Sequence, residues 1–207
     1  MLIAVLRKSL NWAVKRRILS YNAVSYIDIP KAEKYKPTVL DEKQLKTLLD
    51  YCYNEPKLTV VSLIVLLGLR RGEALGLKWS DFDFENKKVH IQRTATPLQG
   101  GYHFSDCKTD DSNRLLSLPD IAVTIIERWK IYQTDLCCSV DNFNCDNFVF
   151  CNYTGKIISC STIRRYFNKA LNDCNLPHIR IHDLRHPYVK PTTKKFITFF
   201  EAFRAAI

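Results

Sequence analysis

The chain has 207 residues, 46% of them hydrophobic, so it can bury a core, and its length suits one domain or one domain plus part of another. Its 31 Lys and Arg against 21 Asp and Glu give a formal net charge of +10, which favours nucleic acid first and an acidic membrane second, although an indifferent basic surface has the same charge. The longest apolar run, residues 58–69, is too short to span a bilayer.

The eight cysteines form no C-x-x-C pair, and no His lies among them at zinc-finger spacing. Without a secretory signal, they predict free thiols in a cytoplasmic protein. A metal site built from some of them is the weaker alternative, with these candidates: Cys137, Cys138, Cys145 and Cys151.

Residues 2–19 place apolar side chains along one helical face and basic ones along the other, which predicts an amphipathic helix. A basic segment without acidic residues could also be a transit peptide. Residues 28–37 are bracketed by prolines and carry Lys34 and Lys36, so they predict a basic linker.

Asp41 is predicted to begin a helix, with Gln44 as its capping-box partner. The apolar run 58–69 follows as a buried helix, which Gly68 to Gly72 interrupt. A short amphipathic segment is predicted over residues 73–79.

Three strands are predicted next: residues 87–95, residues 101–107 and residues 114–119, the last two joined by a turn at 110–113. Together they form a predicted antiparallel meander, one face of which the flanking helices would cover. Helices follow over residues 120–136 and 161–173, and a turn over residues 181–186. The fold class is therefore α+β, mostly helical, with a small three-stranded antiparallel sheet.

Arg70 and Arg71 follow the buried helix, and an arginine that emerges from a core is costly unless its charge is matched. One explanation is structural, in which Glu73 or Asp81 pairs with one of the arginines. The other is that an arginine here binds an anionic ligand.

Lys108 lies beside the predicted strand turn, where most lysines are simply solvated. His182 and Arg185 lie on one face if Asp183 begins a helix, and an imidazole beside a guanidinium suits a phosphate. The alternative is a surface pair bound to Asp173 or Asp183. Taken in order, these cations predict a site that stabilises phosphoryl transfer.

Three motifs in this order resemble the tyrosine recombinases. GLRRGEALGLKWSDFDFENKKVHI resembles their first arginine box, CKTDDSNRLLSLP their β-hairpin lysine segment, and IRIHDLRH their His-x-x-Arg box. Residues 9–40 resemble the end of the family's core-binding domain and its linker. The resemblance extends from about residue 9 to residue 186 and implies a tyrosine-recombinase catalytic domain.

The resemblance implies a role for each matched residue. Arg70 and Arg185 would clamp the scissile phosphate, and His182 would bind it and assist proton transfer. Lys108 would be the general acid for the leaving 5′ oxygen, and Glu73 would orient the arginine box. The supporting and DNA-binding candidates are His186, Arg71, Arg164, Arg165, Lys34 and Lys36.

The implied partner is double-stranded DNA, with other recombinase subunits as a further partner. No cofactor, metal, membrane or small-molecule substrate is implied. The expected location is the cytoplasm, for a protein encoded by a bacterium, a phage or another mobile element.

The resemblance stops after His186. No Leu-Gly-His-like box follows, and the only later tyrosine, Tyr188, is too close to the His box to be the family nucleophile. A frameshift or premature stop is one hypothesis for this change. The predicted domains are a core-binding remnant at 1–30, a basic linker at 31–40, an incomplete catalytic domain at 41–186 and a divergent tail at 187–207.

Two further interpretations stay open beside a site-specific recombinase or integrase. One is a DNA-binding module that does not cleave, and the other is a non-functional remnant. The 207-residue chain is expected not to cleave DNA alone, because no nucleophilic tyrosine is identified in it.

Overall fold

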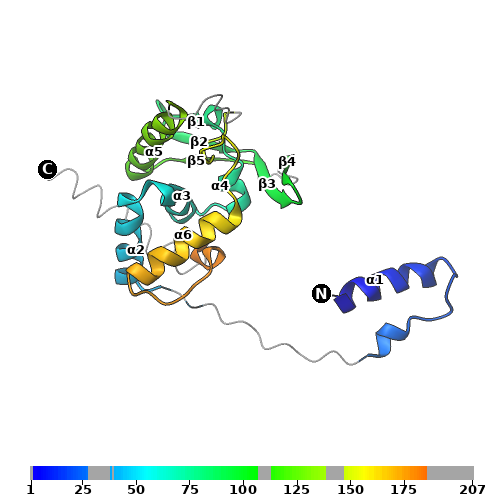
Figure 1. Ribbon diagram of the computed structural model, residues 1–207. Helices are drawn as coiled ribbons and strands as arrows, with labels where there is room; N and C mark the ends of the chain where they lie inside the picture. Colours follow the sequence, from blue (N-terminus) through cyan, green and yellow to red (C-terminus); the bar gives the residue numbers. More distant parts are fainter. Residues whose placement is uncertain (1, 28–37, 39, 107–112, 139–146, 186–207) are drawn as a thin grey trace. The chain divides into compact units, whose positions relative to one another are not determined.

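The computed structural model describes residues 2–27, 38, 40–106, 113–138 and 147–185, and it divides into two units at Lys36 and Pro37 (Figure 1). In the first unit, α1 (Leu2–Lys15) precedes the 3-10 turn η1 (Ala23–Tyr26). α1 ends before the predicted residue 19, because Arg17 has a left-handed backbone with φ 57°. No residue of α1 is buried.

The second unit carries the remaining elements. Its helices and 3-10 turns are α2 (Glu42–Asn54), η2 (Pro56–Leu58), α3 (Thr59–Leu67), α4 (Arg71–Leu75), η3 (Trp79–Asp81), α5 (Asp120–Cys138), α6 (Cys160–Asp173) and η4 (Ile181–Arg185). Its strands are β1 (Phe82–Asp83), β2 (Lys88–Ile91), β3 (Arg93–Leu98), β4 (Gly101–Asp106) and β5 (Arg114–Ser117).

α3 forms the centre of this unit. Its residues from Thr59 to Leu66 are all buried, and it packs against α2, α4, α5, α6 and η4. Figure 1 shows these elements arranged around α3. The predicted buried helix is confirmed, as is the capping box that begins α2: Asp41 accepts from the Gln44 backbone at 2.8 Å, and Gln44 accepts from the Asp41 backbone at 3.0 Å.

The predicted α+β class with a three-stranded antiparallel sheet is confirmed, but the predicted meander is wrong. The sheet has the order β1-β2-β5, whereas β3 and β4 form a separate hairpin. The strand predicted at 87–95 is divided at Gln92. Asp81 accepts a hydrogen bond from the Gln92 side chain at 2.7 Å and another from Arg93 Nη1 at 2.5 Å. These two bonds anchor the chain where β2 ends and β3 begins.

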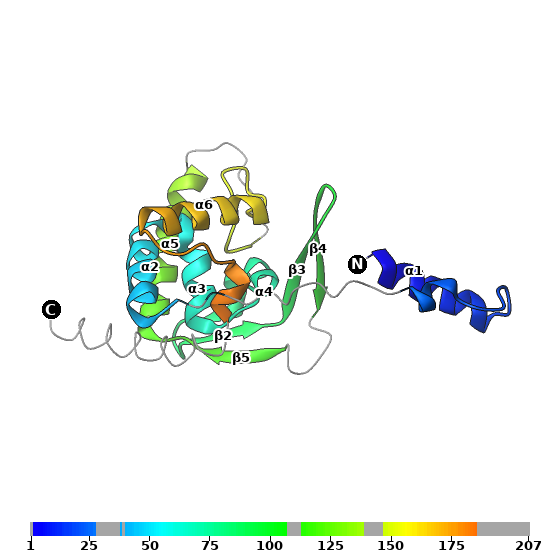
Figure 2. The same cartoon turned by 90° about the horizontal axis from the view of Figure 1, so that it is seen from below.

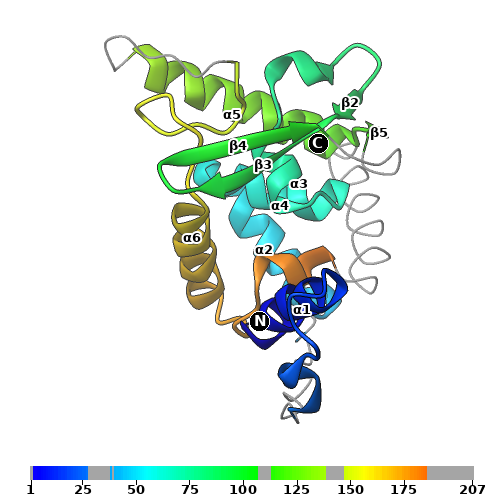
Figure 3. The same cartoon turned by 90° about the vertical axis from the view of Figure 1, so that its right-hand side faces the viewer.

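The β3–β4 hairpin projects beside α4 as a long ribbon (Figure 2). In the view of Figure 3, α5 is drawn above the hairpin and α6 below its tip. Tyr102 ties the hairpin to the segment before α6, because its hydroxyl donates to the Ile158 carbonyl at 3.0 Å. None of the helices within the described ranges combines the length and the apolar character that crossing a bilayer requires.

Candidate functional site

Arg70 lies in the turn between α3 and α4, and the local backbone fixes it there. Gly68 ends α3 with φ 64°, a left-handed conformation that glycine adopts without steric strain. Arg70 then takes the N-cap position of α4. The Glu73 carboxylate accepts from the Arg70 backbone N–H at 2.8 Å and from its Nη1 at 2.7 Å. One carboxylate therefore holds both the backbone and the guanidinium of Arg70.

Gly72 allows α4 to lie against β3. A Cβ at this position would lie 2.7 Å from Thr94 Cγ2 and 2.8 Å from the Ala95 carbonyl oxygen, both closer than real Cβ contacts. A larger residue would push the arginine turn away from the hairpin. The glycine thus sets the distance between the turn and β3.

A second arginine binds the same carboxylate. Arg114, the first residue of β5, places Nη1 3.3 Å from Glu73 Oε1 and Nη2 2.9 Å from Glu73 Oε2. The sequence motifs do not single out this residue. Its place in the segment that resembles the lysine hairpin was a signal, but strand pairing with β2, opposite Ile91, is what brings Arg114 to Glu73.

The Glu73 cluster, defined as Glu73, Arg70 and Arg114, carries a net positive charge. Burial alone would raise the pKa of Glu73, but hydrogen bonds from Arg114 and Arg70 outweigh it and hold the pKa at about 2. Glu73 is therefore ionised at neutral pH and balances one of two guanidiniums. Its side chain is 1% exposed and that of Arg70 55% exposed, so the Arg70 guanidinium faces solvent and suits a phosphate.

η4 carries the His-x-x-Arg motif and is shaped by a second acid–arginine pair. Asp183 accepts from the Arg180 backbone N–H at 3.1 Å and from its Nη2 at 3.0 Å. Ile181 and Leu184 are buried while His182 is exposed. In a 3-10 helix, positions three apart share a face, so the backbone of position 185 is in register with His182.

The two motifs share α3 as a support. Arg70 follows α3, and η4 packs against it. Lys108 and His186 lie outside the described residues, and for Arg185 only the backbone is described. Arg70 and the η4 turn that carries His182 are therefore both next to α3. The convergence of Arg70, Lys108, His182 and Arg185 on one phosphate stays a prediction.

The structure shows the partners of the acidic residues that the sequence suggested as ion-pair partners of the candidate site. Glu73 does pair with Arg70, as that explanation required. Asp81 instead binds Arg93, with 2.5 Å between Nη1 and Oδ2. Asp173 accepts from the Tyr51 hydroxyl at 2.5 Å, and this hydrogen bond raises the pKa of Tyr51 to about 12.

The candidate DNA-binding cations lie on two elements. Arg71 is exposed in the first turn of α4, and Arg164 and Arg165 are exposed on α6. Lys34 and Lys36 lie outside the described residues.

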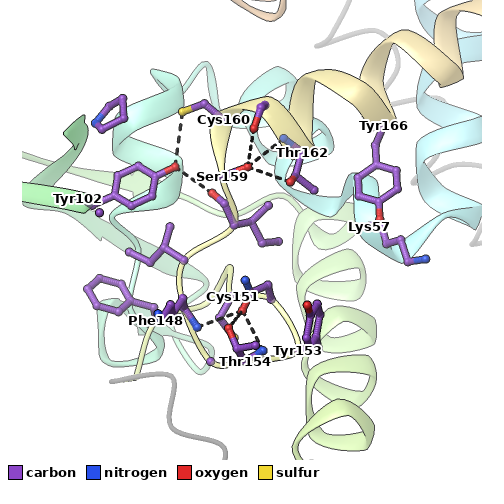
Figure 4. Close-up of a pocket in the computed structure, with 18 of the residues that line it drawn as sticks. Lys57, Tyr102, Phe148, Cys151, Tyr153, Thr154, Ser159, Cys160, Thr162 and Tyr166 are labelled. Carbon is purple, nitrogen blue, oxygen red and sulfur yellow. Dashed lines mark hydrogen bonds between the residues drawn. The ribbon is translucent and has the colours of Figure 1, made fainter. Parts of the chain in front are cut away.

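A groove of about 1210 Å³ lies between the β3–β4 hairpin, α5 and the start of α6 (Figure 4). Its floor includes Phe148 and Ile158, both largely buried. The cations that line it are Lys57, Lys156 and Arg165, and its described lining contains no Asp or Glu. The groove can therefore accept an anionic partner along a rim of cations.

Burial and a contact with Cys160 raise the pKa of Tyr102, whose hydroxyl lies 3.6 Å from Cys160 Sγ in this groove. Tyr102 therefore stays a neutral phenol that fastens the hairpin, which is not the state of an activated nucleophile.

No disulfide joins the cysteines whose placement is described, as predicted. In the same part of the chain, no three His, Cys, Asp or Glu side chains are grouped as ligands of a metal ion. Cys145, one of the four cysteines of the alternative metal site, lies outside it.

Comparisons with known proteins converge on one family. Residues 38–189 match the model of the phage integrase family. A XerC-like tyrosine recombinase of Caldanaerobacter subterraneus is 28% identical over 134 residues, which cover 58% of this chain and 34% of that protein. The ICEBs1 integrase of Bacillus subtilis is 30% identical over 132 residues, 63% of this chain and 36% of that protein.

Solved structures agree on the fold. The Tn1549 transposon integrase in complex with transposon right end DNA superposes with a TM-score of 0.71 at 18% identity, over 89% of this chain and 62% of that one. A lambda integrase dimer bound to a core site gives a TM-score of 0.56 at 16% identity, over 95% of this chain and 53% of that one. The chain spans about a third of the length of the two sequence relatives above.

Proposed function

Because this chain belongs to the phage integrase family of tyrosine recombinases, we propose that it binds double-stranded DNA for site-specific recombination and holds one backbone phosphate at Arg70. The observation that carries the proposal is the Glu73 cluster. A buried carboxylate orients a guanidinium that is 55% exposed and leaves the cluster with surplus positive charge. This is the arrangement that a monoanionic phosphodiester requires.

The remaining roles follow the family motifs residue by residue. Arg185 is the second guanidinium on the phosphate, and His182 binds the same phosphate and assists proton transfer. Lys108 is the general acid that protonates the leaving 5′ oxygen. Glu73 holds Arg70 without contacting the substrate. In this scheme the cationic side chains offset the charge that builds up in the transition state, and no metal or other cofactor takes part.

The duplex contacts a wider surface than the phosphate pocket. Arg71 on α4 and Arg165 on the groove rim are both exposed, and α4 packs against the hairpin that forms one wall of the groove. A cationic rim with no described carboxylate supports contacts to further phosphates. Arg164, His186 and the linker lysines Lys34 and Lys36 are the other proposed supports. Further recombinase subunits would assemble on the same DNA, in the cytoplasm.

The decisive experiment uses a suicide DNA substrate and a polypeptide of these 207 residues. We expect salt-dependent binding to a duplex but no covalent adduct, because the sequence has no tyrosine after Tyr188. Binding without an adduct also fits the alternative of a DNA-binding module that does not cleave, and an adduct would disprove both that alternative and our expectation.

A matched pair of variants locates the binding. Arg70→Gln should weaken duplex binding and lower the slope of log affinity against log salt by about 0.9, as expected for one lost phosphate contact. Lys43→Gln removes the same charge from an exposed position of α2 and should leave the slope unchanged. Equal effects of the two variants would refute a phosphate site at Arg70.

A further inference from the structure

We propose that Arg114 is a positioning residue, which fixes the Glu73 carboxylate so that Glu73 can hold Arg70 toward a phosphodiester. The inference rests on the proposed function of Arg70. Arg114 lies in the segment that resembles the lysine hairpin, but it is not one of the cations that the resemblance assigns to the phosphate. Its role is inferred from its contacts with Glu73.

The first argument is the number of contacts on the carboxylate. Each Glu73 oxygen accepts from both arginines: Oε1 from Nη1 of Arg70 and of Arg114, and Oε2 from the Arg70 backbone and Nη2 of Arg114. Arg70 alone contacts Glu73 from within the same turn, three positions away. Within the described ranges, Arg114 is the residue that reaches Glu73 from another element, so it ties the carboxylate plane to the sheet.

The second argument is the difference in exposure between the two arginines. The Arg114 side chain is 25% exposed and that of Arg70 55% exposed. Arg114 also begins β5, where pairing with Ile91 of β2 holds its backbone in the sheet. The deeper arginine on the rigid strand therefore suits support, and the more exposed arginine on the turn suits ligand binding.

The charge of Arg114 is an effect separate from its geometry. A carboxylate paired with Arg70 alone would cancel its charge, whereas a second guanidinium leaves a net positive charge at the cluster. Charge and geometry make different predictions for a lysine at this position, because lysine keeps the charge but cannot form the planar two-point contact.

The test is a double-mutant cycle that measures the affinity of the purified chain for a mixed-sequence DNA duplex at low salt. Arg114→Gln should lower the affinity about threefold to tenfold in the wild-type background and change it little in an Arg70→Gln background. An equal loss in both backgrounds would mean that Arg114 contacts DNA directly and would overturn the proposal. No loss in the wild-type background would overturn it as well.

Arg114→Lys separates geometry from charge. Under the proposal it loses nearly as much affinity as Arg114→Gln, and the NMR signal of the Arg70 Nε–H, assigned by its disappearance in Arg70→Gln, shifts or broadens. Full affinity and an unchanged signal in Arg114→Lys would refute the positioning role. The lysine variant also serves if Arg114→Gln does not fold. If the proposed function of Arg70 is wrong, Arg70→Gln itself will bind DNA as tightly as the wild type. This outcome differs from those that would overturn the role of Arg114.

Discussion

Two buried carboxylates near the sheet are both held by arginine, but their surroundings differ. Glu73 and Asp81 each have a side chain that is only 1% exposed. Asp81 accepts from Arg93, from Gln92 and from the Lys78 backbone, and Arg93 also donates to the Gly76 carbonyl at 3.2 Å. This Asp81 cluster contains one arginine, 19% exposed, and one carboxylate.

The difference shows what distinguishes a candidate site from a structural ion pair. The Asp81 cluster pairs one arginine with one carboxylate, and its arginine is only 19% exposed, so it anchors the chain between β2 and β3. The Glu73 cluster joins two arginines to one carboxylate, and Arg70 is the more exposed arginine. An acid–arginine pair is therefore weak evidence for function by itself. A carboxylate that binds two arginines, one of them largely exposed, is stronger evidence.

The largest expected effect comes from neutralising the two carboxylates in turn. Glu73→Gln and Asp81→Asn should each lower the free energy of unfolding by about 3 kcal/mol, because each removes the buried carboxylate that a partly buried guanidinium binds. Only Glu73→Gln should also weaken duplex binding. Urea unfolding at neutral pH and fluorescence anisotropy with a DNA duplex measure the two effects. Equal losses of DNA affinity would remove the distinction between the clusters.

The pH dependence of stability tests the Glu73 cluster separately. Its folded pKa of about 2 lies below its ordinary value of 4.5, so the stabilisation is complete above pH 4.5 and is lost as the pH falls from 4.5 to 2. The shift corresponds to about 3 kcal/mol. Urea unfolding of the wild type over this range should show the loss, and Glu73→Gln should show a correspondingly smaller one.

The hydrogen bonds of Asn86 lower the pKa of Asp83, which therefore also contributes in this pH range. Its contribution is the same in the wild type and in Glu73→Gln, so the difference between the two curves isolates Glu73. Parallel curves would show that Glu73 has an ordinary pKa in the folded protein.

Local signals in the sequence predicted the helices well, because caps and apolar periodicity act over short distances. Asp41 and Gln44 begin α2 as expected, and α5 and α6 lie within a few residues of their predicted bounds. Arg70, Glu73 and His182 were found through motifs that are themselves local, and the pairing of Arg70 with Glu73 was one of the alternatives considered.

Strand pairing and Arg114 were not predicted, because both depend on contacts between distant parts of the chain. Alternation indicated strands but not which strand pairs with which, and the break at Gln92 follows from its contact with Asp81. Arg114 reaches Glu73 across 41 residues. Its partner became evident only once β5 was paired with β2.

A smaller effect is expected from the two glycines beside the clusters. A Cβ at Gly72 would overlap the backbone of Ala95, whereas at Gly76 the nearest atoms, Arg93 Cγ and Arg93 O, lie at 3.1 Å. In urea unfolding, Gly72→Ala should therefore lower the free energy of unfolding by about 2 kcal/mol and Gly76→Ala by about 1 kcal/mol. Gly101→Ala is the control, since nothing lies within 4 Å of its Cβ. A neutral Gly72→Ala would show that the contact between α4 and β3 is loose.

The smallest effect is expected from an exposed ion pair, which sets the scale for the buried ones. Lys87 Nζ lies 2.6 Å from Asp120 Oδ1, but the two side chains are 55% and 50% exposed. Water and salt screen such a pair, so Lys87→Gln should lower the free energy of unfolding by about 0.5 kcal/mol or less, and the difference should vanish at high salt. Urea unfolding at low and high salt measures it. A loss as large as that of Asp81→Asn would mean that exposure does not govern the strength of ion pairs in this fold, and the contrast between Arg70 and Arg93 would then lose its physical basis.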